Sequence, residues 1–169
     1  MGIKVPFWGG MSAAGGVALR LWTPTPKMKK EAWVQYVPAL KRAASQADAG
    51  PNFKRLKMWL DNETFLKADN KYHQNGLTAM RFPPASSDLN PIETLWARLR
   101  RDLAIREFED LKNDKVITTT QFKQRVSQLL TSYGCVRPGK RYSYVESLIR
   151  GMPKRLMNCK KKNYGPCGK

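Results

Sequence analysis

The run of residues 82–96, FPPASSDLNPIETLW, constrains the fold more than any other stretch, because it marks the residue at which a helix begins. Asn90 is a favoured N-cap, Pro91 suits the first helical position, and Glu93 stands where a capping box places its carboxylate. Apolar residues then recur at helical spacing along one face: Ile92, Leu95, Trp96, Leu99 and Leu103. The run therefore predicts an amphipathic helix over residues 91–106.

Short β-prone runs alternate with helical patterns along the chain, which is typical of an α/β domain. Strands are predicted over residues 3–10, 17–22, 55–60 and 77–82, and the first two indicate a hairpin. Further helices are predicted over 27–47 with a bend at Pro38, 63–74 ending at Asn75-Gly76, 121–133 capped by Thr120, and 144–150 interrupted at Gly151 and Pro153. With 169 residues, the chain is long enough for one domain with its own core.

Positive charge dominates the chain, with 31 Lys and Arg against 13 Asp and Glu and a formal net charge of +18. A field of this size favours a polyanion, and nucleic acid is the first candidate. The basic residues of the C-terminal segment are the predicted phosphate contacts: Arg137, Lys140, Arg141, Arg150, Lys154, Arg155, Lys160, Lys161 and Lys162. The alternative is a solvated tail that only aids solubility. Three tyrosines among them, Tyr142, Tyr144 and Tyr164, either stack on bases or pack on their own domain.

Four motifs follow one another along the chain. They are Trp8-Gly9-Gly10 with Gly15-Gly16, then Leu60-Asp61-Asn62, then DLNPIE at residues 88–93, and finally VESLIRGMPKRLMNCKKKNYGPCGK at residues 145–169. In this order the motifs closely resemble those of Tc1/mariner-type DDE transposases, and together they cover nearly the whole chain.

The resemblance implies an RNase H-like fold in which Asp61 and Glu93 are two of the family's three metal-binding acids. Asp61 would end a central strand and face Glu93 at the start of a helix, and the pair would bind Mg²⁺. Two such ions, roughly 3.5–4 Å apart, activate a water or a 3′-hydroxyl and stabilise the leaving oxygen. Without the resemblance, Asp61 is equally an ordinary residue at a strand end, and Glu93 is a helix cap.

The chain also departs from the family's pattern. The interval between Asp61 and Glu93 is shorter than usual, and the family's first catalytic Asp lies on a strand upstream of the position of Trp8. The acids that precede Asp61, Glu31 and Asp48, fall in or near a predicted helix and do not match that strand. The family's N-terminal helix-turn-helix region is also missing. The resemblance therefore supplies two catalytic acids where the family uses three.

We therefore expect a truncated RNase H-like mixed sheet flanked by helices over residues 1–134, lacking its first central strand. Residues 135–169 would form a basic C-terminal helix and tail packed on it or extending from it. Because unpaired buried strand edges cost free energy, we expect another protein chain to complete the sheet.

The preferred hypothesis is a non-catalytic, transposase-derived protein that binds DNA or RNA through phosphates as a structural component of a larger assembly. A ribonucleoprotein, such as an organellar ribosome, is one host, and no cofactor is expected. One alternative is a catalytic fragment of a transposase, which would require Mg²⁺. Another is a DNA-binding regulator that competes with the full-length transposase.

Other features argue against a metal or membrane role. The three cysteines and the single histidine, His73, lack the paired spacing of a structural zinc site. No apolar stretch has the length of a membrane span. We therefore expect an intracellular protein, in the nucleus or in an organelle such as the mitochondrion.

Overall fold

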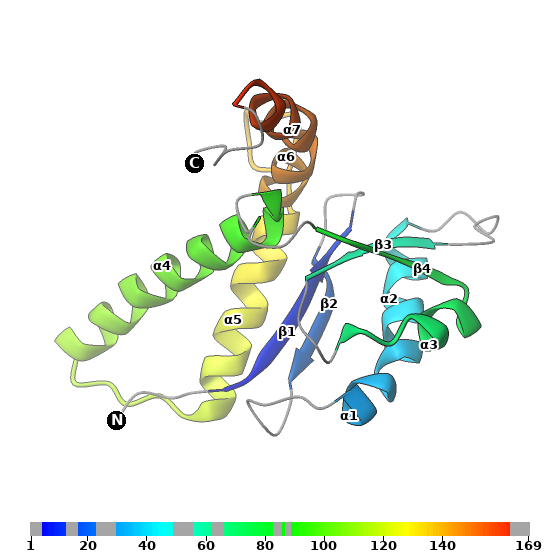
Figure 1. The fold of residues 1–169 in the computed structure, drawn as a ribbon. Helices are drawn as coiled ribbons and strands as arrows, with labels where there is room; N and C mark the ends of the chain where they lie inside the picture. The colour runs from blue at the N-terminus through cyan, green and yellow to red at the C-terminus, as the bar shows by residue number, and fades with distance from the viewer. Residues whose placement is uncertain are drawn as a thin grey trace.

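The computed structural model describes residues 5–12, 17–22, 30–48, 56–61, 66–82, 86 and 89–162. A β-hairpin lies in the middle of the molecule, between a long helical pair on one side and a parallel strand pair with short helices on the other (Figure 1). The arrangement is mixed α/β, as the sequence predicts. No helix within the described residues is long and apolar enough to span a membrane.

The hairpin consists of β1 (Phe7–Met11) and β2 (Val17–Trp22), paired antiparallel with Phe7 opposite Trp22. Both predicted strands are confirmed within the described residues, whereas residues 1–4 and the turn at 13–16 lie outside them. Side chains alternate across a strand, so Trp8 faces one side of the hairpin and Phe7 faces the other.

The predicted helix over 27–47 is divided into α1 (Lys30–Val34) and α2 (Val37–Asp48). The break falls just before Pro38, and the amide of Tyr36 bonds back to the carbonyl oxygen of Trp33 at 2.8 Å. Proline has no N–H and fits the first turn of a helix, so Pro38, the second residue of α2, stands at the start of a new helix and does not merely bend a continuous one.

A parallel pair follows, made of β3 (Leu56–Leu60) and β4 (Leu77–Arg81) with α3 (Asp69–Gln74) between them. The helix predicted over 63–74 was too long at its start, because Ala68 has φ −123° and ψ 43°, which is not helical. Its predicted end is confirmed, with Asn75 as C-cap and Gly76 at φ 73°.

The first core joins α1, α2, α3 and the parallel pair. Within it, Trp33 donates from Nε1 to the Tyr72 hydroxyl at 2.6 Å, and that hydroxyl donates to the Leu66 carbonyl oxygen at 2.9 Å. Both rings are therefore buried with their polar atoms satisfied. The buried members are Trp33, Val37, Leu40, Leu60, Leu66, Ala68, Tyr72 and Leu77, and Trp8 of the hairpin packs against them.

The long helical pair consists of α4 (Pro91–Lys112) and α5 (Thr119–Gly134). Asn90 caps α4 as predicted, accepting a bond from the Ile92 amide at 3.2 Å, but the helix continues six residues beyond the predicted end. The cap of α5 is Thr118, not Thr120, because Thr118 and Gln121 complete a reciprocal capping box.

Two shorter helices complete the chain, α6 (Tyr144–Arg150) and α7 (Met152–Lys161). The helix predicted over 144–150 is confirmed as α6, and it is interrupted at Gly151, which is both the C-cap of α6 and the N-cap of α7. Pro153 does not break the chain a second time, because it stands in the first turn of α7. The α4, α5 and α6 helices enclose the second core, which buries Leu95, Leu99, Val126, Leu129, Leu130, Tyr133, Val145 and Leu148, and Phe7, Met11 and Trp22 of the hairpin pack against it.

The strands do not form the single mixed sheet that the sequence predicts. Among the described residues, β1 and β2 make one two-stranded sheet and β3 and β4 make another, with no ladder between them. Each sheet has a strand edge that pairs with no other described strand. The α/β class is therefore confirmed, while the sheet is in two pieces.

Candidate nucleic-acid and acid-residue sites

Asp61 directly follows the last residue of β3 and is exposed, as the predicted strand end requires. The parallel register sets Leu60 opposite Arg81, so the Arg81 side chain lies beside Asp61 at the end of β3. Arg81 donates to the Asp61 carbonyl oxygen at 3.5 Å, to the Leu66 carbonyl oxygen at 3.1 Å and to Oδ1 of Asp69 at 2.9 Å. One guanidinium thus holds both ends of the segment after β3 and places a positive charge beside it.

Glu93 lies in the first turn of α4, two residues after Pro91. The Asn90 side chain supplies the cap to this turn, and no capping box forms there, so the interpretation of Glu93 as a cap is wrong. The carboxylate is half-buried and makes no hydrogen bond or ion pair with any residue that the structure describes. A carboxylate at a helix start is favoured by the helix dipole and keeps its oxygens available.

Asp61 follows β3 at the edge where both parallel strands end. In Figure 1, α4, whose first turn contains Glu93, begins near the end of β4. Carboxylate oxygens are the donors that Mg²⁺ prefers, so the chemistry of the two acids fits that ion. Within the described ranges, however, no three Asp, Glu, His or Cys side chains form a group that could hold a metal.

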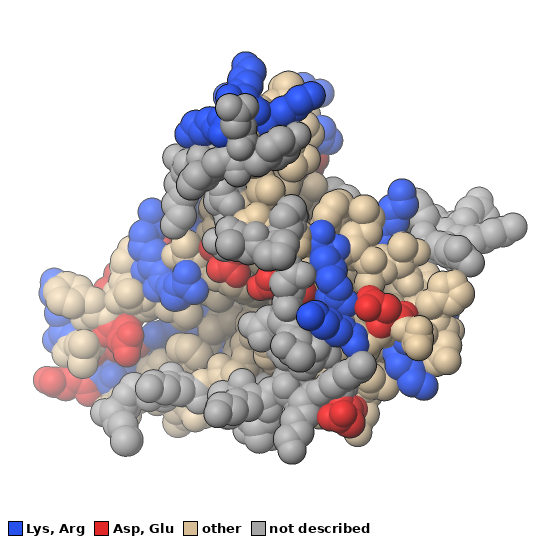
Figure 2. Space-filling model, viewed as in Figure 1, with Lys and Arg blue, Asp and Glu red and all other residues tan. Residues whose placement is uncertain are grey.

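A basic surface covers the C-terminal helices. Eight of the predicted phosphate contacts are exposed, and the ninth, Arg155, is half-buried and donates to the Thr94 hydroxyl at 3.4 Å. The one carboxylate of this region, Glu146, is bound by Arg150 at 2.8 Å. On the face shown in Figure 2, Lys and Arg side chains gather over α7 and along α4. None of the residues of α7 is buried, so its cations are presented to solvent.

Aromatic rings order part of this surface. The guanidinium of Arg150 lies 4.1 Å from the centre of the Tyr142 ring, and that of Arg141 lies 5.3 Å from it. Such stacking restrains a guanidinium while its N–H groups still face outward. Tyr144 packs against Tyr133 with ring centres 5.7 Å apart, so Tyr142 and Tyr144 contact their own domain. Tyr164 lies outside the described residues.

A polar network between α4 and α5 was not apparent from the sequence. Asp102 accepts hydrogen bonds from Arg98 at 2.8 Å and from the Tyr133 hydroxyl at 2.7 Å, and Arg101 lies 3.5 Å away. Burial raises the pKa of Asp102, but these donors outweigh it and lower the pKa below its usual range. Burial and the Asp102 carboxylate both raise the pKa of Tyr133. The network therefore joins the two helices through the largely buried carboxylate of Asp102.

Comparison with known proteins adds one finding to this geometry. A family model described as DDE superfamily endonuclease matches residues 4–115, which covers the hairpin, both strands of the parallel pair and α4. The matched span contains Asp61 and Glu93 and ends before α5. A comparison with curated proteins gives no significant match.

Proposed function

Since the chain belongs to the DDE superfamily endonucleases, we propose that it is a Tc1/mariner-like, transposase-derived domain that binds nucleic acid through its C-terminal helices. The observation that carries the proposal is the basic surface of α6, α7 and the loop before α6. Nine cations there face one carboxylate, and that carboxylate is already paired with Arg150. A polyanion is the ligand that such a surface binds.

The chemistry of the surface favours phosphates over base edges. The exposed lysines of α7 can contact phosphates at many positions along a nucleic acid, because a phosphate backbone is the same at every base. The arginines stacked on Tyr142 suit bidentate hydrogen bonds to phosphate oxygens. Neither feature distinguishes DNA from RNA. Residues 135–169 would thus act as the basic binding segment, with its first helix packed on a transposase-like domain over 1–134.

The test is a binding titration of the full chain at several salt concentrations with mixed-sequence DNA and RNA. A Lys154→Gln, Lys160→Gln, Lys161→Gln variant should bind more weakly and reduce the log–log salt slope, by up to about 0.9 per lost contact on duplex. Truncation at residue 134 is unsuitable, because Val145 and Leu148 belong to the second core.

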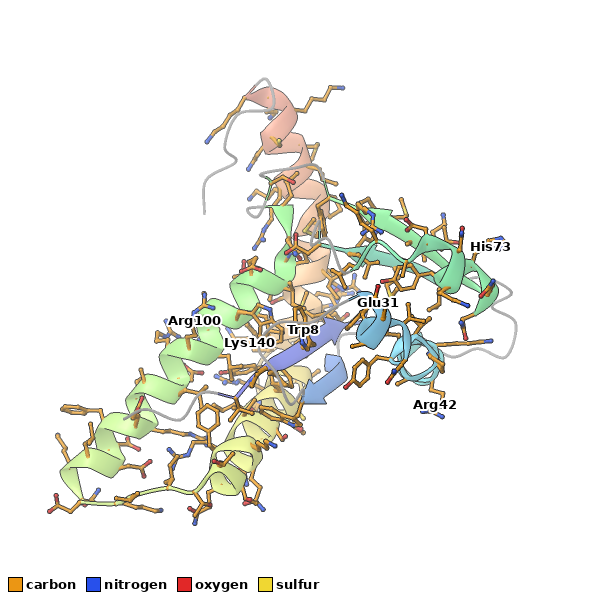
Figure 3. All side chains as sticks on the ribbon, turned by 60° about the horizontal axis from the view of Figure 1, so that its bottom comes forward. Trp8, Glu31, Arg42, His73, Arg100 and Lys140 are labelled. Carbon is orange, nitrogen blue, oxygen red and sulfur yellow. The ribbon has the colours of Figure 1, made fainter. Side chains whose placement is uncertain are left out.

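The matched control is a variant of equal charge change, Lys41→Gln, Arg42→Gln, Lys71→Gln, on the α2 and α3 helices. Arg42 of α2 lies on the other side of the hairpin from Arg100 of α4 (Figure 3). The control should bind almost as tightly as the unmodified chain. Equal losses in the two variants would show that binding depends only on net charge and would reject the C-terminal surface.

For the acids, we propose that this chain alone does not cut or join DNA. Asp61 and Glu93 supply two carboxylates, whereas the mechanism of the resembled family uses three. The expected result is the absence of Mg²⁺-dependent nicking of a supercoiled plasmid by the purified chain. Nicking that the Asp61→Ala and Glu93→Ala variants both abolish would overturn this and favour the catalytic alternative.

The catalytic alternative has one observation in its favour, the available carboxylate of Glu93. It would require a third acid from another segment or another chain. The two-piece sheet suggests where such a segment would bind, because β1 and β3 each have an edge that pairs with no other described strand and that an added strand could use. The side chain of Trp59 on β3, which is 54% exposed, would then be partly buried by the added strand. Affinity purification from nuclease-treated native extract that recovers no protein would count against a partner chain.

The cellular role follows as a further part of the proposal. A basic domain without catalysis suits a structural component of a larger nucleic-acid assembly, such as a ribonucleoprotein, in the nucleus or an organelle. A regulator that competes with a transposase for DNA would need the same surface. Sequencing the nucleic acid that co-purifies with the native chain separates the two, since structural RNA supports the first and transposon DNA the second.

A further inference from the structure

The outer face of α4 is apolar along its C-terminal half. Ile105, Phe108 and Leu111 are 53%, 59% and 70% exposed, although the opposite face of the helix buries Leu95 and Leu99. At 100° per residue, these three side chains lie on the side of the helix turned away from α5 and the second core. Long exposed apolar stripes of this kind are uncommon on monomers and mark contact surfaces.

Along this outer face of α4, side chains become larger toward the C-terminal end of the helix. Toward the start of the helix the same face contains Ala97 and Ala104, both exposed. Ala97, Ala104 and Leu111 are spaced seven residues apart, as in a helix that packs along a partner helix. If a second α4 runs antiparallel and crosses at Ala104, Ala97 of each copy lies opposite Leu111 of the other. Small residues then face large ones at both ends of the contact.

The exposed charges of α4 also differ between its two halves. Arg100 and Arg101 lie in the first half, while Glu107 and Glu109 lie in the second, and all four are exposed. Arg101 is 3.5 Å from Asp102, and Arg100, Glu107 and Glu109 make no ion pair within the part of the chain that the structure describes. In an antiparallel pair about a two-fold axis at Ala104, Arg100 of one copy lies beside Glu107 of the other, on the same side of the contact. A parallel pair would set like charges at the same level.

We propose that the outer face of α4 is a homodimer contact, in which two copies of this chain pair antiparallel about Ala104. The occupant is a second copy because both the size gradient and the charge gradient are self-complementary only in this orientation. On this face the exposed Arg100 and Arg101 are balanced by the exposed Glu107 and Glu109, so it lacks the net positive charge that would favour a polyanion. The inference does not depend on the proposed function.

The experiment is analytical ultracentrifugation of the full chain, freed of nucleic acid, over a range of concentrations. The unmodified chain should show a monomer–dimer equilibrium. Phe108→Glu should raise the dimer dissociation constant by roughly tenfold or more, because dimerisation would bury a carboxylate among apolar side chains. Leu156→Glu on α7, where the leucine is 52% exposed, is the matched control and should leave the equilibrium unchanged.

Charge exchange tests the orientation. Arg100→Glu alone should weaken the dimer by opposing Glu107 of the second copy, and the double variant Arg100→Glu, Glu107→Arg should restore it. Thermal unfolding of each variant confirms that the fold is intact. A chain that stays monomeric at all concentrations, a dimer indifferent to Phe108→Glu, or a double variant without recovery would each overturn the proposal.

Discussion

At the residue scale, Gly9 shows why the Trp-Gly-Gly motif and the helix after Pro91 belong together. A Cβ atom at Gly9 would collide with Cη2 of Trp96 and lie 2.8 Å from its Cζ2, so the indole of α4 rests directly on the backbone of β1. Phe7 holds the same indole from the strand side, with ring centres 5.6 Å apart. A glycine is therefore required here for close approach and not for an unusual backbone conformation.

We predict that Gly9→Ala lowers the free energy of unfolding by about 1–3 kcal/mol, because the methyl group displaces a ring that cannot move freely. Urea denaturation measures the loss. The control is a double-mutant cycle with Trp96→Leu, in which the alanine should cost much less once the indole is gone. A penalty that is unchanged when the Trp96→Leu substitution is also present would mean that the strain lies elsewhere.

At the element scale, α4 and α5 are joined by the Asp102 network as well as by apolar packing. Asp102→Asn retains an acceptor for Tyr133 but removes the charge that Arg98 binds. We predict a loss of about 1–3 kcal/mol at neutral pH, as for a buried group whose charged partner is removed. Glu109→Gln, at an exposed position on the same helix, should change stability very little.

The pH dependence of this loss has a definite sign. The pKa of Asp102 is lower in the folded chain than in the unfolded one, where it is about 3.9. Its stabilisation is therefore complete above about pH 5 and disappears as the pH falls through the folded value. The difference in unfolding free energy between the unmodified chain and Asp102→Asn should be constant near neutrality and shrink in acid. A difference that grows on acidification would contradict this.

At the scale of the whole molecule, the sequence predicts where helices and strands lie better than it predicts how the strands pair and which elements pack together. Asn90 and the Asn75-Gly76 stop are local signals, and the structure confirms both. The cap of α5 is also a local signal, since Gln121 follows Thr118 at the spacing of a capping box. The length of α4 is not encoded locally, because the exposed Ile105, Phe108 and Leu111 do not continue the apolar pattern of the buried face.

The candidate site likewise contains features that the sequence predicts and features that it does not. The positions of Asp61 and Glu93 relative to their own strand and helix follow from local sequence. Arg81 could not be identified, because its role depends on the parallel register of β3 with β4, a pairing between segments separated by α3. The two-piece sheet likewise depends on long-range pairing, which no local pattern encodes.

The alternation of side chains along β1 has a consequence for how the molecule unfolds. Trp8 lines the first core and Phe7 the second, yet outside the hairpin the members of the two cores come from separate stretches of chain, 33–79 and 92–149. A slip of β1 by one residue would exchange the two aromatic rings and damage both cores at once. Loss of this five-residue strand likewise leaves neither core with its full lining. The hairpin thereby makes two separately built halves into one cooperative unit.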